Sequence, residues 1–548
     1  MSRRALAALS LAAVASFAIA AEAKPRLVLV ISIDQFRADY LERFAPWYLP
    51  AGTSSQPGGF QYLTKGGAYY VDAHHAHIPT ATGPGHAAIL SGSVPALNGI
   101  IGNNWFDRAS GKEMYCVDDP SVKTVGGTSK PMSPRNLKTT TVGDELKMAT
   151  NSAAKVVGVA FKDRAAILMA GHAADTVIWF GGDGNMVTST FYAPSGNLPG
   201  WVSAFNGQGL SAKDAGKTWK PLLADNEYRF TRTVPFAKEK NPKPVFQHDL
   251  GKTADKAFYG GWTASPYGQE FIFKAVEAAV VGEKLGQDDV PDVLAVNLST
   301  NDYIGHAYGP NSPEVMDISV RTDRLLSGLF RFLAKTVPGG LDAVEIVITA
   351  DHGVLPIVEE MNNPYRIGTQ RVNESSVGKA IDAALGAKYG EGKYYTYGDE
   401  DNVYLDHALL ESKKIDLAEA QREAAKAVAG VSGIYDAYAT ADVRAGMLPV
   451  TPWAKQIYLS YNPKFSGDVF VLLAAGNYFG GGTGTGHGSA WQYDSHVPIL
   501  MRGPGVKKGV FTRRVVVPDL APTLSVLLGI EPPSGNVGNV LGEAVGSR

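Results

Sequence analysis

The sequence predicts an α/β fold: a mostly parallel central sheet with helices on both faces and with insertions that cap it. Three observations lead to this class. Continuous apolar, β-branched runs, typical of strands buried on both faces, occur at 26–33, 156–161, 292–299 and 344–350. Segments with helical length and periodicity lie between such runs. Acids, histidines or lysine and arginine follow each run directly, where open α/β sheets bind their ligands.

The size and charge of the chain limit the classes of function. With 548 residues, it is long enough for one large catalytic domain with insertions. Hydrophobic residues make up 45% of the chain and charged residues 19%, as in ordinary globular proteins. The formal net charge of −2 does not favour binding to nucleic acid or to an acidic membrane. We expect a monomer that acts on small molecules.

The N-terminus has the pattern of a Sec-type signal peptide. Residues 1–23 contain two arginines, an apolar run and a series of small residues, in that order. We expect cleavage after Ala20 or Ala23, so that residues 24–548 form a periplasmic catalytic domain. A membrane anchor is the alternative, but the run is shorter than the ~20 residues that a spanning helix needs. Cys116 is the only cysteine, which excludes an internal disulfide.

The first strand leads to a candidate nucleophile. The strand at 26–33 ends at Asp34, which taken alone could equally be a helix cap. A loop rich in hydroxyl side chains and glycine follows at 79–92 and runs into a short apolar helix. Thr82 stands at the start of that helix, where unpaired N–H groups and the helix dipole favour an anion. We interpret Thr82 as a nucleophile; a capping role is the alternative, and Thr80 is a second hydroxyl in the loop.

Two further segments offer groups that could hold an anion. The next loop contains the adjacent amides Asn103 and Asn104, and either could turn an N–H₂ donor inward. The strand at 156–161 runs directly into Lys162 and Arg164. These two cations point to the same side if the strand continues, because side chains alternate faces. The alternative for them is a solvated strand end.

The rest of the chain alternates between elements of the sheet and two insertions. Residues of about 185–290 lose the alternation of strand and helix, and we expect an insertion that caps the sheet. A second insertion is expected at about 360–455, with helices near 374–386 and 414–429. The remaining predicted elements are a strand at 292–299, a helix at 313–337, strands at 344–350 and 469–473, a glycine-rich loop at 480–488 and a helix at 518–529.

Acids and histidines follow four of the predicted strands and form a candidate metal site. They are Asp34, Asp302 with His306, Asp351 with His352, and His487 in the glycine-rich loop. Aspartate and histidine are ligands of catalytic zinc, and their number fits two Zn²⁺ ions. An acid and a histidine four residues apart share one face of a helix, so Asp302 and His306 can bind one ion. We expect the separate cluster of His74, His75 and His77 to be structural or solvent-exposed, because no acid pairs with it.

This set of residues predicts a reaction. A threonine hydroxyl is a poor nucleophile at neutral pH, and no histidine in the loop of Thr82 is spaced as an obvious base. Direct coordination to one zinc ion solves this by stabilising the alkoxide. A second ion can stabilise the leaving-group oxygen and later generate the hydroxide that cleaves a covalent intermediate. The reaction expected is in-line displacement at phosphorus.

With these residues assembled, the chain resembles the alkaline phosphatase superfamily. It looks most similar to exported, phosphate-irrepressible alkaline phosphatases with a threonine nucleophile, a branch related to the nucleotide pyrophosphatase/phosphodiesterases. The resemblance covers nearly all of the mature chain and implies an alkaline phosphatase-like fold. The matching segments are LVLVISIDQFR, PTATGPGHAAILSGSVPALNGIIGNNWFD, FKDRAAI, NLSTNDYIGHAYGP, ITADHG, SGDVFVLL and GTGHGSAWQYDSHVPILMRGPG.

The resemblance implies a role for each candidate residue. One zinc would be held by Asp302, His306 and His487, and the other by Asp34, Asp351 and His352. The family pattern T-x-P-x-H selects Thr82 over Thr80 as the nucleophile, and the spacing to the phosphate-binding asparagine selects Asn103 over Asn104. Lys162 and Arg164 match the pair that contacts phosphate oxygens in the monoesterase branch and is missing from the diesterase branch. Phosphate monoesters are therefore the expected substrates, because the extra cations suit a dianion.

Other functions remain as alternatives. A phosphodiesterase of the same superfamily keeps the metals but should lack the Lys162 and Arg164 pair. A sulfatase needs a Cys or Ser in C/S-x-P-x-R, which Cys116 does not provide. A cofactor-independent phosphoglycerate mutase normally uses serine and manganese in the cytoplasm, which the signal peptide opposes. An exported metal-binding protein without activity is the alternative from another class.

Overall fold

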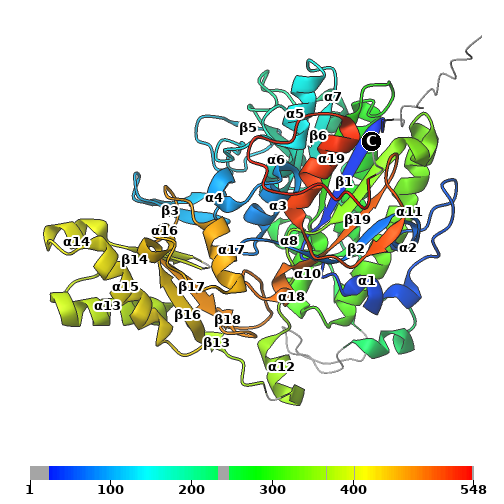
Figure 1. Cartoon of the computed structure of the whole chain (residues 1–548). Helices are drawn as coiled ribbons and strands as arrows, with labels where there is room; N and C mark the ends of the chain where they lie inside the picture. Colours follow the sequence, from blue (N-terminus) through cyan, green and yellow to red (C-terminus); the bar gives the residue numbers. More distant parts are fainter. Residues whose placement is uncertain (1–23, 232–245, 366, 400, 546–548) are drawn as a thin grey trace, which may run out of the picture.

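Figure 1 shows the computed structural model of the chain, which describes residues 24–231, 246–365, 367–399 and 401–545. The predicted signal peptide at 1–23 lies outside the described residues. The α/β class and the mostly parallel sheet are confirmed, with six of the ten strand pairings in the central sheet parallel. Within the described ranges, no helix is both long and apolar enough to cross a membrane.

An eleven-stranded sheet forms the centre of the molecule. Its strands lie in the order β20 (Gly509–Phe511), β2 (Ala68–His74), β19 (His496–Arg502), β12 (Val344–Thr349), β1 (Leu27–Ile33), β11 (Asp292–Leu298), β6 (Val156–Val159), β7 (Thr176–Phe180), β8 (Met186–Ser189) and β5 (Thr124–Val125), with β21 (Val515–Val516) beside β2. β1 pairs in parallel with β11 and β12, so that Val30 lies opposite Ala295 and Val347. All residues of these three strands are buried, which explains their continuous apolar sequence.

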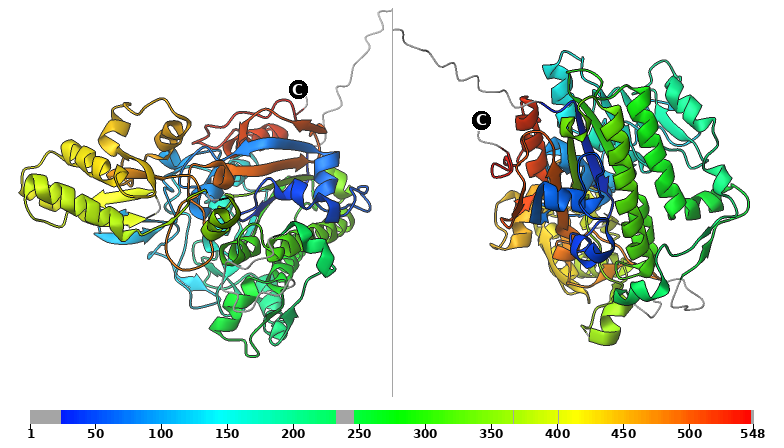
Figure 2. Two further views of the ribbon diagram at one scale, coloured as in Figure 1. Left: turned by 90° about the horizontal axis from the view of Figure 1, so that it is seen from below. Right: turned by 90° about the vertical axis from the view of Figure 1, so that its right-hand side faces the viewer.

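Helices cover both faces of this sheet (Figure 2). One layer consists of α3 (Thr82–Ser91), α5 (Val142–Ala149), α6 (Asp163–Ala170) and α19 (Leu520–Leu528). The other includes α2 (Phe60–Gly66), α9 (Pro266–Gly282), α10 (Thr300–Tyr308) and α11 (Pro313–Thr336). In the right-hand view of Figure 2, α11 and α19 lie on opposite sides of the strands. The acids and histidines that follow β1, β11 and β12 therefore emerge at one edge of a rigid, covered sheet.

The region of 185–290 contributes helices and short strands beside the sheet. It contains α7 (Gly200–Asn206), β9 (Thr218–Trp219), β10 (His248–Asp249) and α8 (Lys256–Thr263), and it ends in α9. α9 packs against β6 and β11, and α7 and α8 pack against α9. Aromatic side chains fill these contacts; the rings of Trp262 and Phe271, for example, lie 5.2 Å apart.

A second, four-stranded antiparallel sheet stands beside the first, at the left of Figure 1. Its strands lie in the order β14 (Tyr395–Asp399), β15 (Asn402–Leu405), β17 (Val469–Leu473) and β16 (Ile434–Ala439). Two helices, α13 (Ser375–Tyr389) and α15 (Leu417–Ala429), pack on it around a separate apolar cluster. The two helices match the predicted ones near 374–386 and 414–429. Three strands of this small sheet were not predicted, because their short, tyrosine-rich segments lack a continuous apolar run.

Candidate active site

Thr82 is the first residue of α3, a helix whose ten residues are all buried. No side chain caps this helix, so the Thr82 hydroxyl is not used as a cap. Its Oγ1 lies 3.4 Å from His352 Nε2 and 3.3 Å from Lys162 Nζ. The hydroxyl of Thr80 instead donates to the carbonyl of Ser489 at 2.8 Å. The geometry thus favours Thr82 over Thr80 as the reactive hydroxyl.

Adjacent parallel strands bring the first group of possible ligands together. Asp34 follows β1, and Asp351 and His352 follow β12. One carboxylate oxygen or ring nitrogen from each lies within 4.8 Å of the other two, and all three residues are 0% exposed. The structure therefore unites the residues predicted for one metal ion.

A second group surrounds Asp302 in α10. Asp302 Oδ1 lies 3.1 Å from His306 Nε2, one turn further along the helix, and 3.8 Å from His487 Nε2. His352 also lies within 4.8 Å of Asp302 and His487, so it stands between the two groups. The rings of His352 and His487 stack with their centroids 3.5 Å apart. All six predicted metal ligands thus converge in one place.

The three histidines share a hydrogen-bond pattern that suits metal binding. In each, Nδ1 bonds to a backbone carbonyl at 2.8–2.9 Å: His306 to Thr485, His352 to Gly353, and His487 to Thr80. Because a carbonyl only accepts, Nδ1 carries the proton and Nε2 keeps its lone pair for a ligand. Metal-bound histidines are oriented in this way by their outer hydrogen bond.

The charges of the site call for additional cations. Asp34, Asp302 and Asp351 are at most 2% exposed, and burying unpaired carboxylates is costly. In the part of the chain that the structure describes, Lys162 is the one lysine or arginine that forms ion pairs with them, at 3.0 Å to Asp34 and 2.6 Å to Asp302. Burial and the neighbouring Asp34 raise the pKa of Asp351 well above its usual range. Divalent cations would balance these charges, so the residues fit a metal centre.

Further groups around Thr82 are suited to hold phosphate oxygens. Asn103 accepts the backbone N–H of Gly83 through Oδ1 at 2.8 Å, which fixes its amide at the start of α3. Arg164 donates through Nη1 to the Tyr115 hydroxyl at 3.0 Å, and that hydroxyl bonds to Asp163 at 2.5 Å. Asn103, Lys162 and Arg164 line the same cavity as Thr82.

Two details of the sequence interpretation are wrong. The strand does not continue to Phe161; β6 ends at Val159, and α6 begins at Asp163 with Lys162 as its cap residue. Lys162 and Arg164 face one cavity because the chain turns from strand into helix there. His487 does not follow a strand of the central sheet, since β17 belongs to the small sheet and the loop comes after β18 (Tyr478–Phe479).

Three supporting residues were not identified from the sequence. Gln35 donates its side-chain amide to Asp302 at 2.7 Å, and its backbone has a φ of 62°, rare for a non-glycine residue. The Asn297 amide lies 3.3 Å from Asp34 Oδ2 and 2.9 Å from His86 Nε2. His86 Nδ1 bonds to the Thr82 carbonyl rather than to its hydroxyl, so His86 is not its base. Of these three residues, only His86 belongs to a sequence pattern that could have identified it, T-x-P-x-H.

The separate histidine cluster is buried rather than solvent-exposed. His74 uses both ring nitrogens, one with Asp72 at 2.6 Å and one with Ser495 at 3.2 Å. Asp72 is thus an acid that the sequence interpretation failed to pair with the cluster. His75 bonds to the Ala350 carbonyl, and His77 is fully buried.

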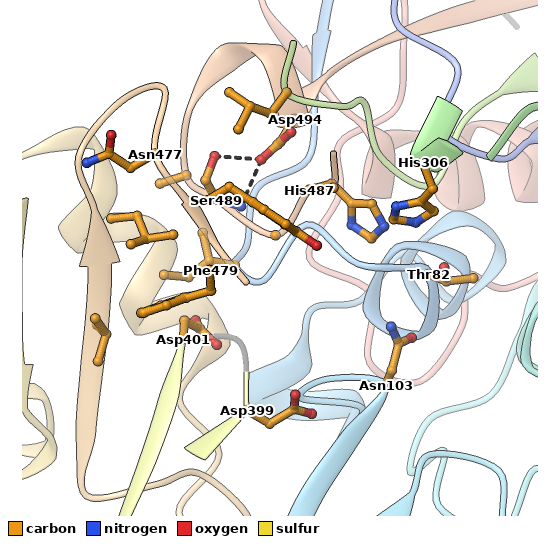
Figure 3. Close-up of a pocket in the computed structure, with 18 of the residues that line it drawn as sticks. Thr82, Asn103, His306, Asp399, Asp401, Asn477, Phe479, His487, Ser489 and Asp494 are labelled. Atoms are coloured by element: carbon orange, nitrogen blue, oxygen red, sulfur yellow. Dashed lines mark hydrogen bonds between the residues drawn. The ribbon is translucent and has the colours of Figure 1, made fainter. Parts of the chain in front are cut away.

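A cavity of about 460 Å³ connects the reactive hydroxyl to the small sheet. Figure 3 shows Thr82, Asn103, His306 and His487 on one side of it, and residues of β14, β17 and β18 on the other. Asp494 also lines the cavity, and it accepts hydrogen bonds from Ser489 at 2.6 and 2.9 Å. The cavity has room for an ester whose phosphoryl group lies at Thr82 and whose alcohol portion extends toward the small sheet.

Comparison with known proteins identifies the relatives of this chain. A family model described as type I phosphodiesterase / nucleotide pyrophosphatase matches residues 28–489. Alkaline phosphatase PhoV of Synechococcus elongatus is 38% identical over 95% of this chain and 92% of its own length. Alkaline phosphatase PafA of Elizabethkingia meningoseptica is 35% identical over 95% of both chains.

The structural comparison gives the same result. A crystal structure of wild-type alkaline phosphatase PafA covers 95% of this chain and 99% of its own, with a TM-score of 0.86 and 34% identity. The resemblance predicted from the sequence motifs is thereby confirmed, and so is the expected fold. The chain belongs to the type I phosphodiesterase/nucleotide pyrophosphatase family and, within it, is similar to the alkaline phosphatases along nearly its whole length.

Proposed function

We propose that this protein is an exported, zinc-dependent alkaline phosphatase that hydrolyses phosphate monoesters through a phosphothreonine intermediate. The observation that carries the proposal is the setting of the Thr82 hydroxyl. It lies 3.4 Å from His352 and 3.3 Å from Lys162, at the start of a helix and beside six clustered acids and histidines. The full-length likeness to alkaline phosphatases supports a phosphoric monoester hydrolase.

The reaction has two displacements at phosphorus. In the first, Thr82 Oγ1 forms a bond to phosphorus while the bond to the alcohol oxygen breaks, and the alcohol leaves with the electron pair and takes up a proton. In the second, water attacks the phosphothreonine, the bond to Thr82 breaks, and inorganic phosphate leaves. When bound, zinc supplies positive charge that stabilises negative charge developing on oxygen. The N-terminus of α3, Asn103 and Arg164 stabilise the other phosphoryl oxygens.

The cations of the cavity decide between monoesters and diesters. A monoester dianion carries one more negative charge than a diester and gains more from Lys162 and Arg164. Each charge-assisted hydrogen bond contributes roughly 1.5–3 kcal/mol in a desolvated site. Both residues line the cavity beside Thr82, which favours monoesters. A phosphodiesterase is the second candidate, because the matching family model carries that description.

Zinc and export rest on separate arguments. The ligand set contains three carboxylates and three imidazoles that present Nε2, a donor set that zinc accepts and that suffices for two ions. Export rests on the signal-peptide pattern of residues 1–23. Metal analysis by mass spectrometry and N-terminal sequencing of protein from a periplasmic fraction test these two points.

The decisive experiment compares kcat/KM for phenyl phosphate and for its diester, methyl phenyl phosphate, on the purified, zinc-loaded protein. We expect the monoester to be preferred by about 10²-fold or more, from two charged contacts. Preference for the diester would assign the protein to the phosphodiesterases. Two bound zinc ions without hydrolysis of either ester would instead indicate an inactive metal-binding protein.

A further inference from the structure

The wall of the cavity farthest from Thr82 belongs to the small sheet and carries acids. Asp399 ends β14, and Asp401 lies in the turn before β15; both line the cavity, with the exposed Glu374 near them. Figure 3 shows Asp399 and Asp401 across the cavity from Thr82. These residues are remote from the candidate metal ligands and have no role in the steps described above.

Asp401 is a buried acid in the wall of the cavity. Asp401 is only 5% exposed. One carboxylate oxygen accepts the side-chain amide of Asn402 at 2.8 Å, whereas Oδ2 has no hydrogen-bond partner. Burial raises the pKa of Asp401 to about 8. Asp401 lines the cavity, so a cationic group there would favour the ionised form of its carboxyl.

The other residues of this wall suit an organic cation. Phe479 and Tyr478 of β18 line the same cavity, and an ammonium group gains energy over aromatic faces. Val471 and Leu472 of β17 supply apolar surface between them and the acids. Among the described lining residues, the lysines and arginines are Lys162 and Arg164, and both belong to the phosphate side. The lysine and arginine of the cavity thus lie at its phosphate end, and the opposite end is acidic and aromatic.

We propose that the acidic wall is a subsite for the alcohol portion of the substrate and selects alcohols that carry an ammonium group. This inference rests on the proposed function, since it assigns a class of phosphate monoester to the same cavity. The phosphoryl group is held at Thr82, and the ammonium lies against Asp401, Asp399 and the ring of Phe479. An alcohol that carries a second anionic group is rejected by the same carboxylates.

Two esters that differ in one atom test the subsite. Choline phosphate and 3,3-dimethylbutyl phosphate have the same shape, but a quaternary nitrogen in the first replaces a carbon in the second. We expect kcat/KM for choline phosphate to be about tenfold higher or more, the equivalent of roughly 1.4 kcal/mol. The comparison needs only the wild-type protein, so it does not depend on the folding of a variant. Equal kcat/KM values for the two esters would overturn the proposal.

A variant then locates the effect. Asp401→Asn removes the charge with little change in shape and should reduce the ratio of the two kcat/KM values toward one. Asp436→Asn is the matched control, because Asp436 lies on β16 of the same sheet but is not part of the cavity lining. An unchanged ratio in Asp401→Asn, in a protein with wild-type melting behaviour, would contradict the assignment.

The two possible failures are distinguishable. If the wild-type protein hydrolyses neither these esters nor phenyl phosphate, the proposed function itself fails. If it hydrolyses phenyl phosphate and does not distinguish the charged from the uncharged ester, only the subsite proposal fails.

Discussion

At the scale of the residue, Thr82 depends on groups that come from distant parts of the chain. Its hydroxyl contacts His352 from the end of β12 and Lys162 from the start of α6. Lys162 in turn bonds to Asp34 and Asp302. Lys162 thus connects Thr82 to both groups of candidate metal ligands. Burial alone would lower the pKa of Lys162, but Asp302 and Asp34 outweigh burial and raise it, so the amine stays charged.

Thr82→Ala should reduce kcat/KM for phenyl phosphate by roughly 10³-fold or more, as expected when the group that forms a covalent intermediate is lost. Zinc content measured by mass spectrometry should stay the same, because Thr82 is one of several groups around the metals. Residual activity well above a thousandth of the wild-type rate would argue against Thr82 as the nucleophile.

Combined Lys162→Ala and Arg164→Ala substitutions should lower kcat/KM for a monoester by about 10²-fold or more and affect the matched diester far less. The reason is the additional charge of the monoester dianion. Kinetics with both esters on the same preparation measure the difference. Equal losses on the two esters would show that the cations do not select the monoester.

At the scale of the element, close contact between α3 and the end of β12 holds the site together. Gly85 of α3 lies so near this segment that a Cβ atom would come within 2.1 Å of the Asp351 carbonyl oxygen. All ten residues of the helix are buried, so it has little freedom to move outward. Glycine is therefore needed here for the distance between helix and strand rather than for a special backbone conformation.

Gly85→Ala should cost about 1–3 kcal/mol of stability through overpacking and should lower zinc affinity, because it pushes α3 against Asp351. Gly386→Ala in α13 is the control. A Cβ there meets nothing within 4 Å, so it should be neutral or stabilise by about 0.5–1 kcal/mol. Chemical denaturation and zinc titration of both variants test this pair. Similar behaviour of the two would contradict the packing argument.

β12 also contains Glu345, whose carboxylate oxygens are buried without hydrogen-bond partners. Burial raises the pKa of this carboxyl well above its usual value of 4.5 in the folded state. The folded protein thus binds this proton more tightly than the unfolded chain, and the resulting stability is lost as the pH rises above about 4.5 toward the raised folded pKa. The Glu345→Gln variant has no carboxyl to titrate at this position. The difference in melting temperature between the variant and the wild type should therefore shift in favour of the variant as the pH rises.

Thermal melts of wild type and Glu345→Gln between pH 5 and 9 measure this effect, with Glu391→Gln as a control at an exposed position. A difference in melting temperature that stays constant, or shrinks, with rising pH would show that the carboxyl of Glu345 does not titrate as its burial indicates.

At the scale of the whole molecule, two sheets face each other across one cavity. The elements around the large sheet present Thr82 and the candidate metal ligands, and the small sheet presents the wall proposed to face the alcohol. Because the wall is built by the region of 360–480, substitutions there should alter the proposed alcohol subsite without disturbing the parallel strands that carry the candidate metal ligands. Because the carboxylates of the site are buried, we expect bound metal to stabilise the whole fold.

Removal of zinc with a chelator should therefore lower the melting temperature. At free zinc a thousandfold above Kd, bound metal contributes about 4 kcal/mol per ion. Without it, Lys162 pairs with Asp34 and Asp302, and the buried Asp351 has no ion pair with a lysine or arginine among the described residues. Circular dichroism melts before and after chelation, and after zinc is restored, measure this effect. If mass spectrometry verifies that the metal is lost and the melting temperature is unchanged, the metals do not contribute to the stability of the fold.

The sequence by itself determined the parallel sheet and the candidate residues that gather at its edge, because continuous apolar runs and the polar residues directly after them are local features. It placed Asp34, Asp302 and Asp351 at strand ends, and the parallel pairing of β1, β11 and β12 explains why they meet. What only the tertiary structure decided are contacts between distant segments. Tyr115 reaches Arg164, Gln35 reaches Asp302, and Asp401 faces the cavity. Such contacts depend on packing between elements, which leaves no periodic signal in the chain, and for that reason the site was predictable while its supporting residues and the acidic wall were not.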